Sequence, residues 1–145
     1  MSGENVLALV QYRLEQADNA VHAAHILLDQ QLFRDATNRS YYGMFYAVLA
    51  LLATKQLGTS KHQGVLSLFD REFVRTGVFD RTLSAWLHTA FDMRLTADYT
   101  ELVTIPQNEV RKNLQQAETF VSLVKTYLNN LLTDASEPEG TGSSV

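Results

Sequence analysis

The sequence contains no cysteine, which excludes disulfides, thiolate catalysis and zinc or iron–sulfur sites held by cysteine. It also lacks the basic start and apolar core of a signal peptide. No apolar run is long enough to cross a bilayer, since the longest, Tyr41–Ala53, has only 13 residues. These absences predict a soluble protein of the reducing cytoplasm.

A surplus of basic residues is missing as well. The formal net charge is −4, and the stretch 133–145 holds three of the acids (Asp134, Glu137 and Glu139) and no Lys or Arg. Without this stretch, the chain has 12 basic and 13 acidic groups. A protein that binds long nucleic acid non-specifically normally carries an excess of basic residues. Contact with a short RNA segment in a local cleft stays open.

Strand signals are scarce, because alternating apolar patterns are short and hairpin dipeptides such as Asn-Gly are absent. Instead, apolar residues recur every three or four positions, the spacing of amphipathic helices. This spacing predicts five helices, at about 6–28, 33–57, 60–77, 80–95 and 104–132. The economical architecture is an all-α antiparallel bundle of four to five helices.

We predict one domain, residues 1–132, because there is no internal repeat and no second set of helices. Residues 133–145 are polar, acidic and rich in small residues. Such a composition cannot bury enough apolar surface to fold, which predicts a disordered acidic tail.

The second predicted helix is apolar on nearly all sides between Tyr41 and Leu52. A helix of this kind is buried on most of its surface. One explanation is a homodimer in which a second copy covers this helix or its neighbour. The alternative is a central helix of a monomeric bundle.

Arg39 opens this apolar stretch, and a guanidinium at the edge of an apolar helix needs a partner, a phosphate or solvent. Tyr42 and Tyr46 follow at three and seven residues, so the three side chains share one helix face. Aromatic residues on such a helix serve either as core or interface contacts, or as platforms on which bases stack.

Several segments together resemble the HEPN family (higher eukaryotes and prokaryotes nucleotide-binding domains). The similarity covers nearly the whole chain to about residue 132. The segments that carry it are NRSYYGMFYA (38–47), SKHQGV (60–65), FVRTG (73–77), FDMRLTADY (91–99) and the closing helix 108–128.

The resemblance implies an antiparallel, usually dimeric helical bundle that needs no cofactor or metal. Many HEPN proteins are metal-independent ribonucleases, and some are toxins neutralised by a partner nucleotidyltransferase. Their motif is an arginine followed, after four to six residues, by a histidine. Such a pair suits RNA cleavage by the 2′-hydroxyl, because imidazole accepts a proton and guanidinium stabilises phosphorane charge.

Arg39 matches the motif arginine, whereas Tyr46 stands where members with the longest spacing have histidine. A phenol with a pKa near 10 is a poor base at neutral pH. It still donates hydrogen bonds to phosphate and stacks on bases. Arg39 and Tyr46 are therefore the candidate catalytic residues, and the family activity is in question.

Lys61 and His62 are candidates for a second part of the binding site. Ser60 and Gln63 match a capping box, which would place Lys61 and His62 in the first turn of the third helix. Free backbone donors at a helix start favour anions. With Arg39 and Tyr42, these two residues are candidates for binding a nucleotide or RNA. The alternative is an exposed polar helix start.

The other polar residues favour structural explanations. His22 and His25 have a spacing that binds metal, but no carboxylate motif accompanies them, and we predict no metal site. His88 suits a hydrogen-bonded bundle residue. Arg94 and Asp98, four apart, predict an ion pair on a helix surface.

Three functions follow. The first is a dimeric HEPN-like protein that binds nucleotide, RNA or a nucleotidyltransferase through a cleft at Arg39, with cleavage weakened or lost. The second is a metal-independent ribonuclease toxin of a toxin–antitoxin pair. The third is a purely structural interaction domain, in which Arg39 is only paired or solvated.

Overall fold

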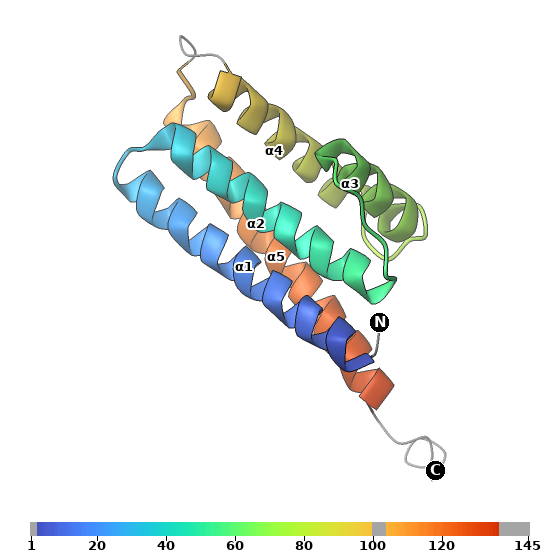
Figure 1. Ribbon diagram of the computed structural model, residues 1–145. Coiled ribbons are helices and arrows are strands. Elements are labelled where there is room, and N and C mark those ends of the chain that lie inside the picture. The colour runs from blue at the N-terminus through green and yellow to red at the C-terminus, as the bar shows by residue number, and fades with distance from the viewer. Residues whose placement is uncertain (1–2, 100–103, 137–145) are drawn as a thin grey trace.

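The computed structural model describes residues 3–99 and 104–136, and every regular element in them is helical. The elements are α1 (Gly3–Asp29), α2 (Phe33–Thr54), α3 (His62–Phe69), the π-helical turn η1 (Asp70–Val74), α4 (Arg81–Tyr99) and α5 (Gln107–Ser136). The four long helices run alternately up and down, while α3 and η1 link α2 to α4 (Figure 1). The predicted all-α antiparallel bundle is thereby confirmed.

Helix α2 lies at the centre of the bundle, and this position explains why it is apolar on nearly all sides. It packs against α1, α4 and α5, and α3 also contacts it. Most of its side chains from Ser40 to Ala53 are buried within the single chain. The chain's own helices thus cover most of the apolar surface that suggested a dimer through α2, while Tyr42, Tyr46 and Leu49 stay partly exposed.

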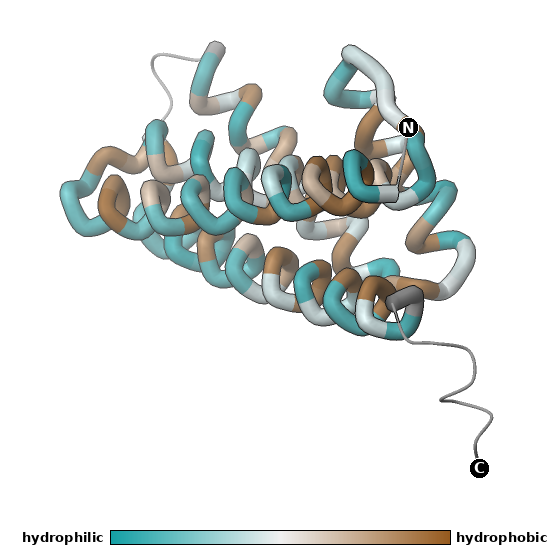
Figure 2. The backbone as a smooth tube through the Cα atoms, turned by 60° about the horizontal axis from the view of Figure 1, so that its bottom comes forward, coloured by the Kyte–Doolittle hydropathy of each residue, from teal (hydrophilic) through white to brown (hydrophobic). Residues whose placement is uncertain are grey.

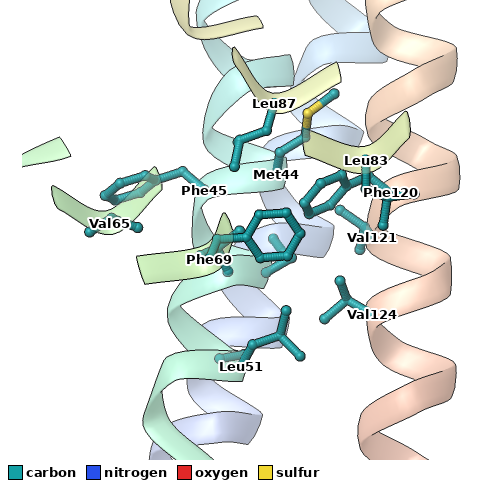
Figure 3. Close-up of a cluster of buried hydrophobic side chains, with 14 of the residues drawn as sticks. Met44, Phe45, Leu51, Val65, Phe69, Leu83, Leu87, Phe120, Val121 and Val124 are labelled. Carbon is teal, nitrogen blue, oxygen red and sulfur yellow. The ribbon is translucent and has the colours of Figure 1, made fainter. Parts of the chain in front are cut away.

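The larger of two clusters of buried hydrophobic residues joins these elements. Phe69 of α3 packs against Phe120 of α5, with ring centroids 5.5 Å apart. Side chains from α2, α3, α4 and α5 meet around this pair, as Figure 3 shows for Met44, Leu51, Val65, Leu87 and Val124. Hydrophobic and hydrophilic residues alternate along the helices (Figure 2), as the spacing of amphipathic helices predicts.

Helices α1 and α2 approach each other closely at Gly43. A Cβ atom there would lie 2.8 Å from Cγ2 of Val21, closer than side chains tolerate. The absence of a side chain at Gly43 therefore allows the segment 38–47 of α2 to lie close against α1.

The ends of α2 and α3 differ from the sequence prediction. Helix α2 ends at Thr54 rather than near Gly58, because Gln56 adopts a left-handed conformation (φ 54°) and the Leu57 N–H donates to the Leu52 carbonyl at 3.0 Å. The predicted capping box is wrong: extended Lys61 is the N-cap of α3, without a side-chain hydrogen bond. His62 is therefore the first residue of α3.

Helix α5 continues to Ser136, four residues beyond the predicted domain boundary at 132. The remainder of the predicted tail, residues 137–145, lies outside the described residues. Among the described residues, no helix has the length and apolar character needed to cross a membrane.

Candidate functional site

Five polar or aromatic side chains from three helices gather at one edge of α2, and we name them the Tyr42 cluster. They are Arg39, Tyr42 and Tyr46 of α2, His62 of α3 and Arg94 of α4. The sequence predicted the first four as candidates. The fold brings them together because α3 and α4 both pack against α2.

The Tyr42 ring is the centre of the cluster. The Arg39 guanidinium carbon lies 4.8 Å from its centroid, in the range of a cation–π interaction. The Tyr46 ring lies 5.6 Å away and the His62 imidazole 5.8 Å away, measured between centroids. Arg39 and Tyr46 thus share Tyr42 as a neighbour, as their helical stripe predicts.

Arg39 has capacity left for a ligand. Its guanidinium donates to Oδ1 of the adjacent Asn38 at 2.9 and 3.1 Å. Among the residues that the structure describes, no carboxylate lies within ion-pair distance of it. A half-buried guanidinium without an acidic partner is a natural site for phosphate.

Arg94 is the residue that sequence reasoning misplaced. The predicted ion pair with Asp98 is confirmed at 3.9 Å, but the Arg94 side chain is only 13% exposed, so Arg94 lies mostly below the helix surface on which it was expected. Arg94 donates to the Tyr42 hydroxyl at 2.9 Å, and its guanidinium lies 5.1 Å from the centroid of the Tyr41 ring. Burial against aromatic rings 52 residues away in sequence could not be read from local spacing.

His62 is held on its inner side by aromatic residues. Its Nδ1 and the Tyr41 hydroxyl are joined by a 2.8 Å hydrogen bond. The Phe45 ring stacks on the imidazole with a centroid separation of 4.4 Å and an interplanar angle of 12°. The imidazole therefore has a fixed orientation at the start of α3.

Burial and the nearby Arg94 guanidinium lower the pKa of His62 below its usual value. Burial also raises the pKa of the Tyr41 hydroxyl, which keeps that group protonated. The His62–Tyr41 pair is therefore neutral at neutral pH. When Nδ1–H donates to the Tyr41 oxygen, Nε2 is left as a proton acceptor. When the hydroxyl donates instead, Nε2–H is a donor suited to a phosphate.

The remaining candidates lie outside this arrangement. Lys61 is exposed at the N-cap of α3, and its amino group makes no hydrogen bond or ion pair within the described residues. His25 pairs with Glu118 at 3.0 Å, and His88 with Asp70 at 2.8 Å. Among the described residues, no group of three or more potential metal ligands occurs.

The shifted pKa of His62 gives a direct prediction. In an NMR titration, the His62 ring should titrate below about 6.5, the ordinary value for histidine. An Arg94→Met variant should raise the pKa, because the cationic neighbour is gone. The folded protein binds the His62 proton more weakly than the unfolded chain does. The free energy of unfolding should therefore decrease as the pH falls through about 6.5. A pKa at or above the ordinary value in the wild type would contradict the arrangement.

The structure is thus an all-α bundle in which arginine and aromatic side chains meet in the Tyr42 cluster. The sequence model of the HEPN domain family matches residues 10–127. A protein named UPF0332 from Thermotoga maritima is 37% identical over 123 residues, which cover 85% of this chain and 93% of the relative.

Two proteins of Methanocaldococcus jannaschii are also similar. "Putative toxin MJ0142" is 36% identical over 79% of this chain and 78% of its own length, and "Putative toxin MJ0605" is 34% identical over 85% and 91%. The chain belongs to the HEPN domain family. The recognition made from its sequence is confirmed.

Proposed function

We propose that this HEPN protein acts in the cytoplasm by binding the phosphate and bases of RNA, or a nucleotide, at the Tyr42 cluster. The observation that carries the proposal is Arg39, whose guanidinium has no carboxylate partner among the described residues and lies on the Tyr42 ring. Arg39 binds a phosphate. Tyr42 and Tyr46 offer faces on which bases stack, and exposed Lys61 adds a second cation.

RNA cleavage is a second candidate, and the position of His62 favours it. Tyr46 cannot serve as base, but His62 lies against the same Tyr42 ring that Arg39 covers. Neutral His62 would accept the proton of a 2′-hydroxyl, whose oxygen bonds to the adjacent phosphorus as the bond from phosphorus to the 5′-oxygen breaks, and the leaving 5′-oxygen takes a proton from water. Arg39 would stabilise the charge of the phosphorane. A toxin role agrees with the names of the archaeal relatives.

One set of reactions separates these functions. Wild type, Arg39→Ala, Tyr46→Phe and His62→Ala are incubated with mixed single-stranded RNA in a chelator. Intact RNA that binds the wild type but not Arg39→Ala supports the binding protein. Cleavage lost in both Arg39→Ala and His62→Ala supports the ribonuclease. If RNA is neither bound nor cleaved, the protein is a structural interaction domain and the proposal fails.

We also propose a homodimer in which a second copy lies beside the Tyr42 cluster and encloses it. Tyr42, Tyr46 and Leu49 at this edge of α2 are only partly buried, which leaves apolar surface for a partner. Size-exclusion chromatography with light scattering should give twice the 16.3 kDa chain mass at micromolar concentration. Monomer mass alone would contradict the dimer.

A small nucleotidyltransferase is the proposed antitoxin, as the family resemblance implies. The two proteins should co-purify when expressed together. Growth arrest by this chain alone, relieved by its partner, would support the toxin role. An adjacent nucleotidyltransferase gene would identify the partner to test.

A further inference from the structure

A groove is lined by α3, η1 and the segment that precedes α3, and we name it the α3–η1 groove. It has a volume of about 450 Å³, within the range of small-molecule sites. Its lining includes Thr59 of the preceding segment, Gly64 and Ser67 of α3, Arg71 of η1, and Arg75 directly after η1. None of these residues belongs to the Tyr42 cluster.

Two arginines of this groove have donors to spare. The Arg75 side chain makes no hydrogen bond or ion pair within residues 3–99 and 104–136. Arg71 donates from Nε to the Glu72 carboxylate at 3.0 Å, which leaves its two Nη groups for a ligand. In the described part of the chain, no carboxylate lines the groove. Two guanidinium groups beside one hollow repel each other, and a bound anion would remove this cost.

The charge of this region contrasts with that of the whole chain. The formal net charge of the chain is −4. Residues 55–75 have four basic and two acidic side chains, a net charge of +2, namely Lys55, Lys61, Arg71 and Arg75 against Asp70 and Glu72. Both acids already have basic partners, Asp70 in His88 and Glu72 in Lys55 and Arg71. An excess of positive charge therefore remains around the groove.

Hydroxyl groups add neutral donors to the two arginines. A Cβ atom at Gly64 would lie 2.6 Å from Cγ2 of Thr59, so the glycine lets Thr59 lie against α3. The Lys61 N–H donates to Oγ1 of Thr59 at 3.4 Å, and the hydroxyl hydrogen of Thr59 is left for a ligand. Ser67, four residues before Arg71, brings a second hydroxyl to the groove.

We propose that the α3–η1 groove binds a phosphate group, carried either by a small phosphorylated compound or by the backbone of a nucleic acid strand. Guanidinium groups match the oxygens of phosphate in pairs, and hydroxyl groups bond to the remaining oxygens. A carboxylate has only two oxygens and would leave part of these donors unused. The groove therefore suits phosphate better than an acidic peptide. This site goes beyond the proposed function, because it needs no residue of the Tyr42 cluster.

Residue-resolved NMR with inorganic phosphate as the probe tests the site. Potassium phosphate is titrated into isotope-labelled protein at constant pH and ionic strength, and the Nε–Hε signals of Arg71 and Arg75 are followed. We expect saturable shifts of both signals, and much smaller ones with potassium acetate. Arg39→Ala should show the same shifts, so failure of the groove is separable from failure of the Tyr42 cluster.

Variants of exposed Arg75 test whether the groove is a site or only a region of positive charge. Arg75→Ala should bind phosphate about tenfold more weakly or less, as read from the Arg71 signal, because a charged hydrogen-bond donor is lost. Arg75→Lys keeps the charge but not the forked donors, and should also bind more weakly than the wild type. Arg111→Ala, an exposed arginine on α5, is the control and should bind as the wild type does.

A second titration, with short single-stranded oligo(U), identifies the source of the phosphate. Shifts of the Arg71 and Arg75 signals that inorganic phosphate competes away assign the group to a nucleic acid strand. Signals that respond to inorganic phosphate but not to oligo(U) assign it to a small phosphorylated compound.

The proposal is overturned if inorganic phosphate gives no saturable shift at Arg71 and Arg75, or if acetate shifts both signals as much. It is also overturned if Arg75→Ala or Arg75→Lys binds phosphate as tightly as the wild type, since the shifts would then report only the screening of charge.

Discussion

An Arg39→Ala variant is expected to bind single-stranded RNA about ten- to a hundredfold more weakly than the wild type. Hydrogen bonds to a charged partner contribute about 1.5–3 kcal/mol, and each 1.4 kcal/mol is a tenfold change in affinity. Arg39 should give a loss of this size because it has no competing carboxylate in the described residues. Fluorescence anisotropy with a labelled RNA oligonucleotide measures the change.

The salt dependence tests whether the lost contact is to phosphate. For single-stranded RNA, the slope of log affinity against log salt should fall by about 0.7 in Arg39→Ala, the contribution of one phosphate contact. Arg81→Ala, an exposed arginine at the start of α4, is the matched control and should leave the affinity nearly unchanged. Equal losses in the two variants would mean that only overall charge matters.

A Phe120→Ala variant is expected to lose about 3–5 kcal/mol of unfolding free energy, as buried phenylalanines do when truncated. Phe120 is fully buried and its ring contacts Phe69, so its loss opens a cavity between α3 and α5. Domains of this size are stable by only about 5–15 kcal/mol, and the variant should therefore be close to unfolding.

Urea denaturation followed by circular dichroism measures this loss. Leu123→Ala is the control on the same helix, because Leu123 is 43% exposed and should lose far less. Similar losses for Phe120→Ala and Leu123→Ala would show that α5 does not pack as described.

The helices were largely predictable, because their signal is local. The three-and-four spacing of apolar residues located all four long helices. Their ends were less predictable. Gln56 takes the left-handed position that glycine usually fills, and tertiary contacts rather than Ser60 set the start of α3.

The site was predictable only where its residues share one helix. Arg39, Tyr42 and Tyr46 form a stripe that the sequence shows directly. The hydrogen bond between His62 and Tyr41 and the one that Arg94 donates to Tyr42 span 21 and 52 residues, and only the packing of α3 and α4 on α2 creates them. Charge spacing on α4 suggested an exposed Arg94, since a pair four residues apart is common on helix surfaces.

The structure differs most from the sequence prediction in where it places a histidine relative to Tyr42. Reading along the chain, the motif position holds Tyr46, a poor base. In three dimensions, His62 lies against Tyr42 from a different helix. The Tyr42 cluster therefore contains a histidine, although no histidine follows Arg39 at the spacing of the family motif. For this reason RNA cleavage is a candidate function to be tested.

The most direct test of the central proposal is to map RNA onto the protein by NMR. Single-stranded RNA is added to isotope-labelled protein, and backbone and side-chain shifts are followed residue by residue. The account predicts that the largest changes fall on Arg39, Tyr42, Tyr46 and His62. Changes confined to other surfaces, or none at saturating RNA, would contradict it.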